Sequence, residues 1–207
     1  MRSFPLSRRR VLAVATGALT LTTAPAFAAI DIEGILHDPE TPTGGNPKGD
    51  VTIVAFTDYN CPFCKKSEPD LQRIVKDDGK IRLVYKDWPI LAASSVFGAR
   101  MALAARYQDA YERAHNALMA IPGPHVPTDK MTAAIEGASI DMAKLKSDLD
   151  AHDDVITGIL KRTMAQANSL ALQGTPTYLI GPFRTSTLDY DGFRTAIADA
   201  RVRQAVK

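Results

Sequence analysis

Two cysteines three positions apart, between a strand-like run and a helix-like run, constrain this chain more than any other feature. Cys61 and Cys64 are the only cysteines among its 207 residues. The preceding run, VTIVAFTDY, is β-branched and nearly all apolar, which is typical of a strand covered on both faces. The following run, PFCKKSEPDLQRIVKDDG, predicts a helix that ends at Gly79. The pair is therefore expected at the N-terminus of a helix that follows a buried strand.

The rest of the chain predicts a small α/β fold with a long helical block. The run KIRLVYKDW is a second strand, so a parallel strand–helix–strand unit is expected. Further helices are expected over residues 92–121, 129–140, 141–152, 153–172 and 188–204. Asp141 and Asp153 are candidate N-caps. The run QGTPTYLIGPF predicts a turn and a short strand, and residues 38–50 predict an ordered turn or loop.

The cysteine pair has two structural explanations besides redox chemistry. A structural zinc site needs four ligands, and a CxxC motif supplies two. The histidines that could complete it are His37, His115, His125 and His152. None forms a short pair, and each is expected to be a surface or hydrogen-bonded histidine. A structural disulfide with this spacing would close a very small loop and so stabilise the fold little.

The position of the pair favours redox chemistry. Cys61 is expected at or next to the helix N-cap, where free backbone N–H groups and the helix dipole favour an anion. This environment lowers a cysteine pKa and produces a nucleophilic thiolate. Pro62 suits the first helical position because it needs no N–H partner. Cys64 lies one turn later and can attack a mixed disulfide at Cys61.

The segment FTDYNCPFCKKSEPD resembles the active-site segment of the thioredoxin superfamily, in particular the bacterial DsbA-like thiol-disulfide oxidoreductases. Pro69 falls where such active-site helices are kinked. The run GTPT, residues 174–177, is similar to the cis-proline loop of the family. The resemblance covers residues 35–205. It implies a thioredoxin-like fold with a DsbA-type helical insertion at about 92–172, and a substrate held beside Cys61 by the main chain of Thr175 and Pro176.

The sequence departs from the family pattern at the strand before the motif. Some members carry a buried acid there, which accepts the proton of the second cysteine. Here the inward positions are Val54, Ala55 and Phe56. Asp58 is the nearest acid, and it is either a proton acceptor for Cys64 or a solvated loop acid, with the second favoured.

The dipeptide between the cysteines, Pro62-Phe63, is expected to modulate the redox couple. A strongly oxidising member of the family has a histidine at the second position, which can stabilise the thiolate. Phe63 cannot donate a hydrogen bond or carry charge. A milder oxidant is therefore expected, between about −270 mV for thioredoxin and about −120 mV for DsbA.

The N-terminus predicts export. Residues 1–28 combine an arginine cluster, the apolar run VLAVATGALTL and a small-residue cleavage site, as in a signal peptide of the general secretory or twin-arginine type. The alternative is an uncleaved anchor. Residues 29–49 are then a lead-in and residues 50–207 the thioredoxin-like domain. Without residues 1–28 the chain has 21 basic and 23 acidic residues, which argues against nucleic-acid binding.

The expected function is a periplasmic thiol-disulfide oxidoreductase that donates disulfides to exported proteins through Cys61 and Cys64. Its expected substrates are unfolded or reduced exported proteins, and family resemblance implies re-oxidation by a membrane quinone-linked DsbB-like protein. No cofactor or metal is expected. The short lead-in leaves no room for a dimerisation module, so a monomeric oxidase is favoured over an isomerase. A reductase is a further alternative, and it needs an electron-donating partner that the sequence does not show. A different alternative is a protein that binds a soft metal through the two thiolates.

Overall fold

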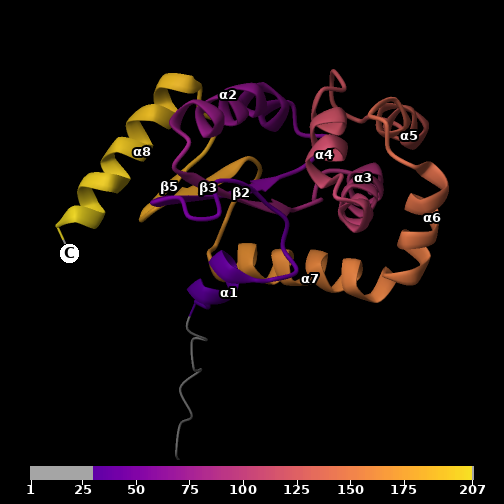
Figure 1. Cartoon of the computed structure of the whole chain (residues 1–207), viewed down its shortest axis with the longest axis horizontal. Coiled ribbons are helices and arrows are strands. Elements are labelled where there is room, and N and C mark those ends of the chain that lie inside the picture. The colour runs from indigo at the N-terminus through magenta and orange to yellow at the C-terminus, as the bar shows by residue number, and fades with distance from the viewer. Residues whose placement is uncertain (1–29, 207) are drawn as a thin grey trace, which may run out of the picture.

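The computed structural model describes residues 30–206 (Figure 1). The predicted signal peptide lies outside the described residues. Within them, no helix has the length and apolar character that crossing a bilayer requires. The strands are β1 (Thr43–Gly45), β2 (Val51–Thr57), β3 (Ile81–Asp87), β4 (Thr177–Ile180) and β5 (Phe183–Thr185). The helices are α1 (Ile32–His37), α2 (Pro62–Asp78), α3 (Ala93–Ala105), α4 (Tyr111–Met119), α5 (Thr128–Gly137), α6 (Met142–Ala151), α7 (Asp153–Ser169) and α8 (Tyr190–Ala205).

The five strands form one mixed sheet in the order β1-β3-β2-β4-β5. Strands β2 and β3 are parallel, with Val54 opposite Val84, while the other pairs are antiparallel. The predicted parallel unit is therefore confirmed, with α2 as its crossover. Helix α2 ends before Gly79, which adopts the left-handed conformation that glycine favours. The predicted end of this helix is also confirmed.

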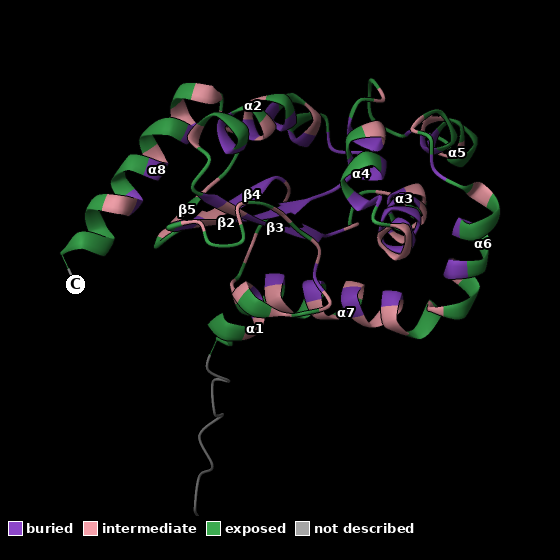
Figure 2. Ribbon diagram, viewed as in Figure 1, coloured by how far each residue is buried: buried purple, intermediate pink, exposed green. Residues whose placement is uncertain are grey.

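Helices cover both faces of the sheet (Figure 1). Helices α2 and α8 lie on one face, and α1 and α7 lie on the other. The α1–α7 face has its own apolar cluster, which contains Ile35, Val54, Phe56, Val84, Trp88 and Ala167. Six of the seven β2 residues are buried, and the central strands are coloured accordingly in Figure 2. The apolar run before the cysteines is thus a strand covered on both faces, as predicted.

In the helical block between β3 and β4, helices α3 to α6 lie beside the sheet (Figure 1). The prediction of one helix at the start of this block is wrong. Residues 92–121 do not form one helix but α3, a 3₁₀ turn (Arg106–Gln108) and α4. The chain reverses at Asp109, which has a φ of 53°. This reversal packs α4 back against α3. The alanine-rich sequence gives a continuous helical propensity, and tertiary packing overrides it here.

The two predicted N-caps differ in outcome. Asp141 caps α6 by accepting a hydrogen bond from the Lys144 amide. Asp153 is instead the first residue of α7, where it pairs with Arg100 of α3. The N-cap of α7 is His152, whose side chain makes no capping bond. Its ring stacks on Tyr107 with the centroids 3.6 Å apart.

The lead-in is more structured than the sequence predicts. Strand β1 lies within the region expected to be a turn or loop, and it pairs with β3 at the sheet edge. The sequence patterns also do not predict helix α1 or strand β5. Gly45, the last residue of β1, has a φ of 66°, and an added Cβ would lie 2.5 Å from the Ile81 carbonyl oxygen. This position therefore favours glycine. The sheet therefore begins before residue 50, where the sequence places the start of the domain.

Candidate active site

Cys61 occupies the N-cap of α2, as the sequence predicts. Its backbone is extended, and its Sγ accepts a hydrogen bond from the Cys64 amide at 3.3 Å. Pro62 follows at the first helical position. Because free backbone N–H groups and the positive end of the helix dipole point toward the N-cap, a negative charge on Cys61 is stabilised there.

The two cysteines have opposite protonation behaviour. The pKa of Cys61 is lowered from 9.0 to about 6, mainly by a hydrogen bond from the Cys64 thiol. Burial opposes this shift, while Thr175 and the backbone amides of Phe63 and Cys64 add to it. Burial raises the pKa of Cys64 far above its ordinary value, and the neighbouring Cys61 raises it further. At neutral pH the pair therefore holds one thiolate and one thiol, and the two sulfurs are unbridged in this structure.

The loop before β4 lies against the cysteine pair. The peptide bond between Thr175 and Pro176 is cis. The Thr175 carbonyl oxygen lies 3.2 Å from Cys61 Sγ, although the two residues are 114 positions apart. The structure therefore brings Cys61, Cys64 and Thr175 together. The role of Thr175 and Pro176 in holding a substrate stays a prediction.

Phe63, the second residue of the dipeptide, points into solvent. It is 59% exposed, far more than either neighbouring cysteine, both of which are buried. An exposed phenyl ring beside a reactive sulfur offers apolar contact to a polypeptide and no charge to a thiolate. Its expected effect on the redox couple stays a prediction.

Asp58 is not a solvated loop acid, and that interpretation is wrong because only 1% of the residue is exposed. Its Oδ1 accepts hydrogen bonds from the Asn60 amide at 2.7 Å and the Ser95 hydroxyl at 2.6 Å. Its Oδ2 accepts from the amides of Ile90 and Leu91 at 2.8 and 2.9 Å. The carboxylate thus joins the loop before α2 to the loop before α3. Its role as a proton acceptor stays a prediction.

A buried acid and a buried histidine lie behind the cysteine helix. The sequence predicts that His115 is a surface or hydrogen-bonded residue, and it is 1% exposed. His115 Nδ1 lies 2.9 Å from the Tyr59 hydroxyl, and Nε2 lies 3.2 Å from Glu68 Oε1. Glu68 lies four residues after Cys64 on the same helix face, and this spacing is the only sequence signal that could have placed an acid near the cysteines. Nothing in the sequence marks His115 as its partner.

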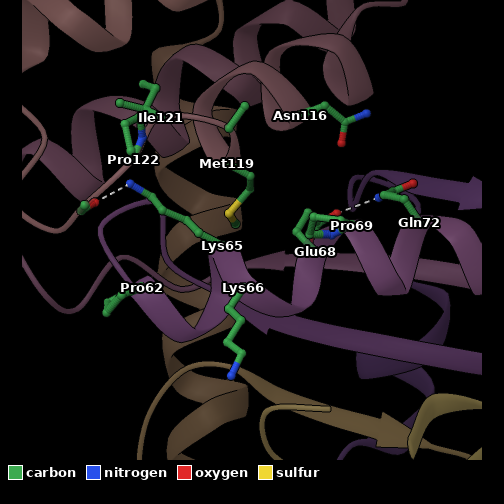
Figure 3. Close-up of a pocket in the computed structure, with 12 residues that line it drawn as sticks. Pro62, Lys65, Lys66, Glu68, Pro69, Gln72, Asn116, Met119, Ile121 and Pro122 are labelled. Carbon is green, nitrogen blue, oxygen red and sulfur yellow. Dashed lines mark hydrogen bonds between the residues drawn. The ribbon is translucent and has the colours of Figure 1, made fainter. Parts of the chain in front are cut away.

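A cavity of about 600 Å³ separates α2 from α4 beside the cysteine pair (Figure 3). Its walls are mainly apolar and include Pro62, Pro69, Met119, Ile121 and Pro122. Lys65 and Gly123 both line the cavity, and the Lys65 ammonium donates a hydrogen bond to the Gly123 carbonyl at 2.7 Å. Glu68, Gln72 and Asn116 line its polar end, and Lys65 and Lys66 also contribute to the lining.

Comparison with known proteins identifies the fold. Residues 37–199 match the family model Thioredoxin_4, described as thioredoxin. The chain belongs to the thioredoxin family. A thioredoxin-like oxidoreductase from Silicibacter pomeroyi DSS-3 is 35% identical and has a TM-score of 0.77, over 83% of this chain and 98% of that one. The thiol-disulfide exchange protein alpha-DsbA2 from Wolbachia pipientis is 25% identical and has a TM-score of 0.75, over 81% and 90%.

These likenesses place the chain with the DsbA-like thiol-disulfide oxidoreductases of the thioredoxin family, as the active-site segment predicts. The thioredoxin-like fold with its helical insertion is confirmed. A curated relative, the Na(+)/H(+) antiporter NhaA 3 of Salinispora tropica, is 27% identical over 83% of this chain and 28% of its own length. The chain spans about a quarter of the length of the curated antiporter relatives it matches. Such a match supports the family and not the antiporter activity.

No group of three or more His, Cys, Asp or Glu side chains within residues 30–206 is arranged to hold a metal ion. Cys61 and Cys64 could supply two thiolate ligands. The alternative of a soft-metal-binding protein stays a prediction.

Proposed function

We propose that this protein donates disulfide bonds to exported proteins through the Cys61–Cys64 couple. The observation that supports this direction is the lowered pKa of Cys61, about 6. A stabilised thiolate favours the reduced form of the pair, so the oxidised form tends to pass its disulfide on. This pKa lies between about 7 in thioredoxin and about 3.5 in DsbA. The protein is accordingly a milder oxidant than DsbA, as Phe63 also suggests.

The reaction transfers two electrons from the substrate to the pair. A substrate thiolate attacks Cys61 Sγ of the oxidised pair, a mixed disulfide forms, and Cys64 leaves and takes up a proton. A second substrate thiolate then attacks the substrate sulfur of the mixed disulfide. The substrate disulfide forms, and Cys61 leaves as a thiolate. Its N-cap position stabilises this leaving group.

The substrates are extended, unfolded or reduced exported proteins. The carbonyl of Thr175 already lies beside Cys61, so a substrate strand can add to the loop before β4 by main-chain hydrogen bonds. The proposal has three further parts. The protein is re-oxidised by a membrane quinone-linked DsbB-like protein, it acts as a monomer, and it is located in the periplasm. The signal-peptide pattern in residues 1–28 supports the location.

Refolding of ribonuclease tests the direction of the reaction. The oxidised protein should form disulfides in reduced, unfolded ribonuclease, and should recover little activity from scrambled ribonuclease. Cys64→Ala is the matched control, because it keeps Cys61 but cannot form the intramolecular disulfide and so should donate none. Efficient rescue of scrambled ribonuclease by the monomer would identify an isomerase instead.

A further inference from the structure

The Cys64 proton needs a destination, and the strand before the motif does not offer one. Cys64 has no exposed surface, and burial keeps it in the thiol form. Each turnover must nevertheless add a proton to Cys64 when it leaves, or remove one when it attacks. The β2 side chains that share a cluster with the cysteine helix are Val51, Ile53 and Ala55, which cannot carry a proton. A group elsewhere in the fold must therefore exchange it.

Glu68 is placed to exchange this proton. It lies four residues after Cys64 on the buried face of α2, so their side chains are neighbours along the helix. The residue is 5% exposed. Its Oε1 accepts a hydrogen bond from Gln72 at 2.6 Å. Its Oε2 is buried and has no hydrogen-bond partner in the described part of the chain, so this oxygen is free to receive a proton.

His115 of α4 is the partner that keeps Glu68 charged when Cys64 is protonated. Its Nε2 lies at ion-pair distance from Glu68, and Tyr59 fixes the other ring nitrogen. The rings of Tyr85 and Tyr111 pack on the imidazole at centroid distances of 4.8 and 5.8 Å. A buried acid with a buried cationic partner is a costly arrangement, since breaking it leaves one charge uncompensated.

The charges around this pair come from every element packed against it. Burial raises the pKa of Glu68, but His115 outweighs it and the net shift is downward. Burial lowers the pKa of His115, but the surrounding carboxylates raise it overall. The titratable groups that face the pair are Tyr59 before α2, Cys64 on α2, Tyr85 and Asp87 on β3, Tyr111 and Glu112 on α4, and Tyr178 on β4.

The cavity between α2 and α4 connects Glu68 to solvent. Glu68 is one of its lining residues, together with Gln72 and Asn116, and Figure 3 shows the three at one end of the cavity. Pro62, the residue that follows Cys61, lines the opposite end. A proton held on Glu68 therefore has a route to solvent along the polar end of the cavity.

We propose that Glu68, held charged by His115, exchanges the Cys64 proton with solvent through the α2–α4 cavity. This inference rests on the proposed function. When Cys64 attacks a mixed disulfide at Cys61, its proton passes to the Glu68 carboxylate, the Cys61–Cys64 bond forms, and the partner sulfur leaves as a thiolate. When Cys64 leaves during disulfide donation, the proton moves in the opposite direction.

Oxidation of the reduced protein by oxidised glutathione separates the two steps. Cys61 first forms a mixed disulfide with glutathione, and Cys64 then displaces glutathione; acid quenching and mass spectrometry count both species. In Glu68→Gln the second step should slow at least about tenfold at pH 7, since positioned acid–base groups contribute about 10²–10⁴-fold. The first step, which depends on Cys61, should change less than about twofold.

The pH profile distinguishes proton exchange from a structural role. Without Glu68, hydroxide must take the Cys64 proton, so the rate of the second step in Glu68→Gln should rise steeply with pH and approach that of the original protein. Asp70→Asn, which removes a negative charge from the same helix, should leave both steps unchanged. His115→Gln is the second variant. It removes the partner that lowers the pKa of Glu68, so the pH profile of the second step should move to higher pH.

The outcomes separate this inference from the proposed function. A second step in Glu68→Gln with the original rate and pH profile would overturn the proton-exchange role while leaving the oxidoreductase intact. The proton-exchange role is also overturned if Glu68→Gln does not fold and His115→Gln leaves the pH profile in place. Failure of the original protein to form any mixed disulfide at Cys61 would instead remove the proposed function.

Discussion

At the level of single residues, the active site depends on a contrast between two identical thiols. Cys61 has amide donors and the helix N-terminus around it, whereas Cys64 is fully buried in the main core cluster. The contrast arises within one helical turn, because hydrogen bonds stabilise a charge on Cys61 while burial keeps Cys64 in the thiol form. The side chain between them, Phe63, is the simplest place to change the balance.

Phe63→His should make Cys61 more acidic and the protein more oxidising. An imidazolium beside the thiolate would lower the pKa of Cys61 below about 6. Thiolate absorbance in the far ultraviolet as a function of pH measures the pKa, and equilibrium with glutathione measures the potential. Phe63→Ala removes the ring without adding a charge and should leave the pKa near its original value.

Two results would contradict this role for Phe63. An original protein with a potential near about −120 mV, the value for DsbA, would show that a histidine is not needed for strong oxidation. A Phe63→His variant with an unchanged pKa would show that this position does not reach the thiolate.

At the level of helices and loops, buried polar groups hold the segments around the cysteine helix. Asp58 accepts four hydrogen bonds that fix the loop before α3 against the loop before α2. Asn60 continues this arrangement, because its side-chain oxygen accepts from the Val126 amide at 2.6 Å. The N-terminus of α2 is therefore held in place by the helical block as well as by β2.

Asp58→Ala should lower the free energy of unfolding by about 3 kcal/mol, because it leaves buried donors without an acceptor. Urea unfolding of the reduced protein measures the change. Asp58→Asn keeps one acceptor oxygen and should cost less. If Asp58→Asn slowed the Cys64 step of glutathione oxidation and left stability unchanged, Asp58 would be the proton acceptor and not a structural group.

Across the whole molecule, two arginines join segments that are distant in sequence. Arg162 of α7 pairs with Asp38 and Glu40 of the lead-in. Arg201 of α8 pairs with Asp50 and Asp78, at the start of β2 and the end of α2. These contacts attach α7 to the lead-in and α8 to the start of β2 and the end of α2.

Acid should destabilise the fold partly through these pairs. Arg201 holds the pKa of both Asp50 and Asp78 below 3.8. A lowered folded-state pKa contributes stability that is present above about pH 3.8 and is lost as the pH falls through the folded value. Arg201→Ala should therefore be less stable than the original protein near neutral pH, and the difference should shrink in strong acid. Urea midpoints across this range measure it, and a difference that is constant with pH would rule out this contribution of Arg201.

The features of this protein that depend on local order could be predicted from the amino-acid sequence. A buried strand, a CxxC motif and a helix with proline near its start predict Cys61 at or next to the N-cap, because proline favours the first helical position. The same local reasoning predicts the parallel unit, the end of α2 at Gly79 and the capping of α6 by Asp141. The active-site segment and the GTPT run then predict the family.

The surroundings of the cysteine pair could not be predicted in this way, because they are set by tertiary contacts. The contact of His115 with Glu68 joins two helices that are distant in sequence, and the burial of Asp58 depends on the loop before α3. The reversal at Asp109 and the edge strands β1 and β5 also depend on partners elsewhere in the chain. Local propensity carries no information on such contacts, because their free energy comes from burial and pairing between distant segments.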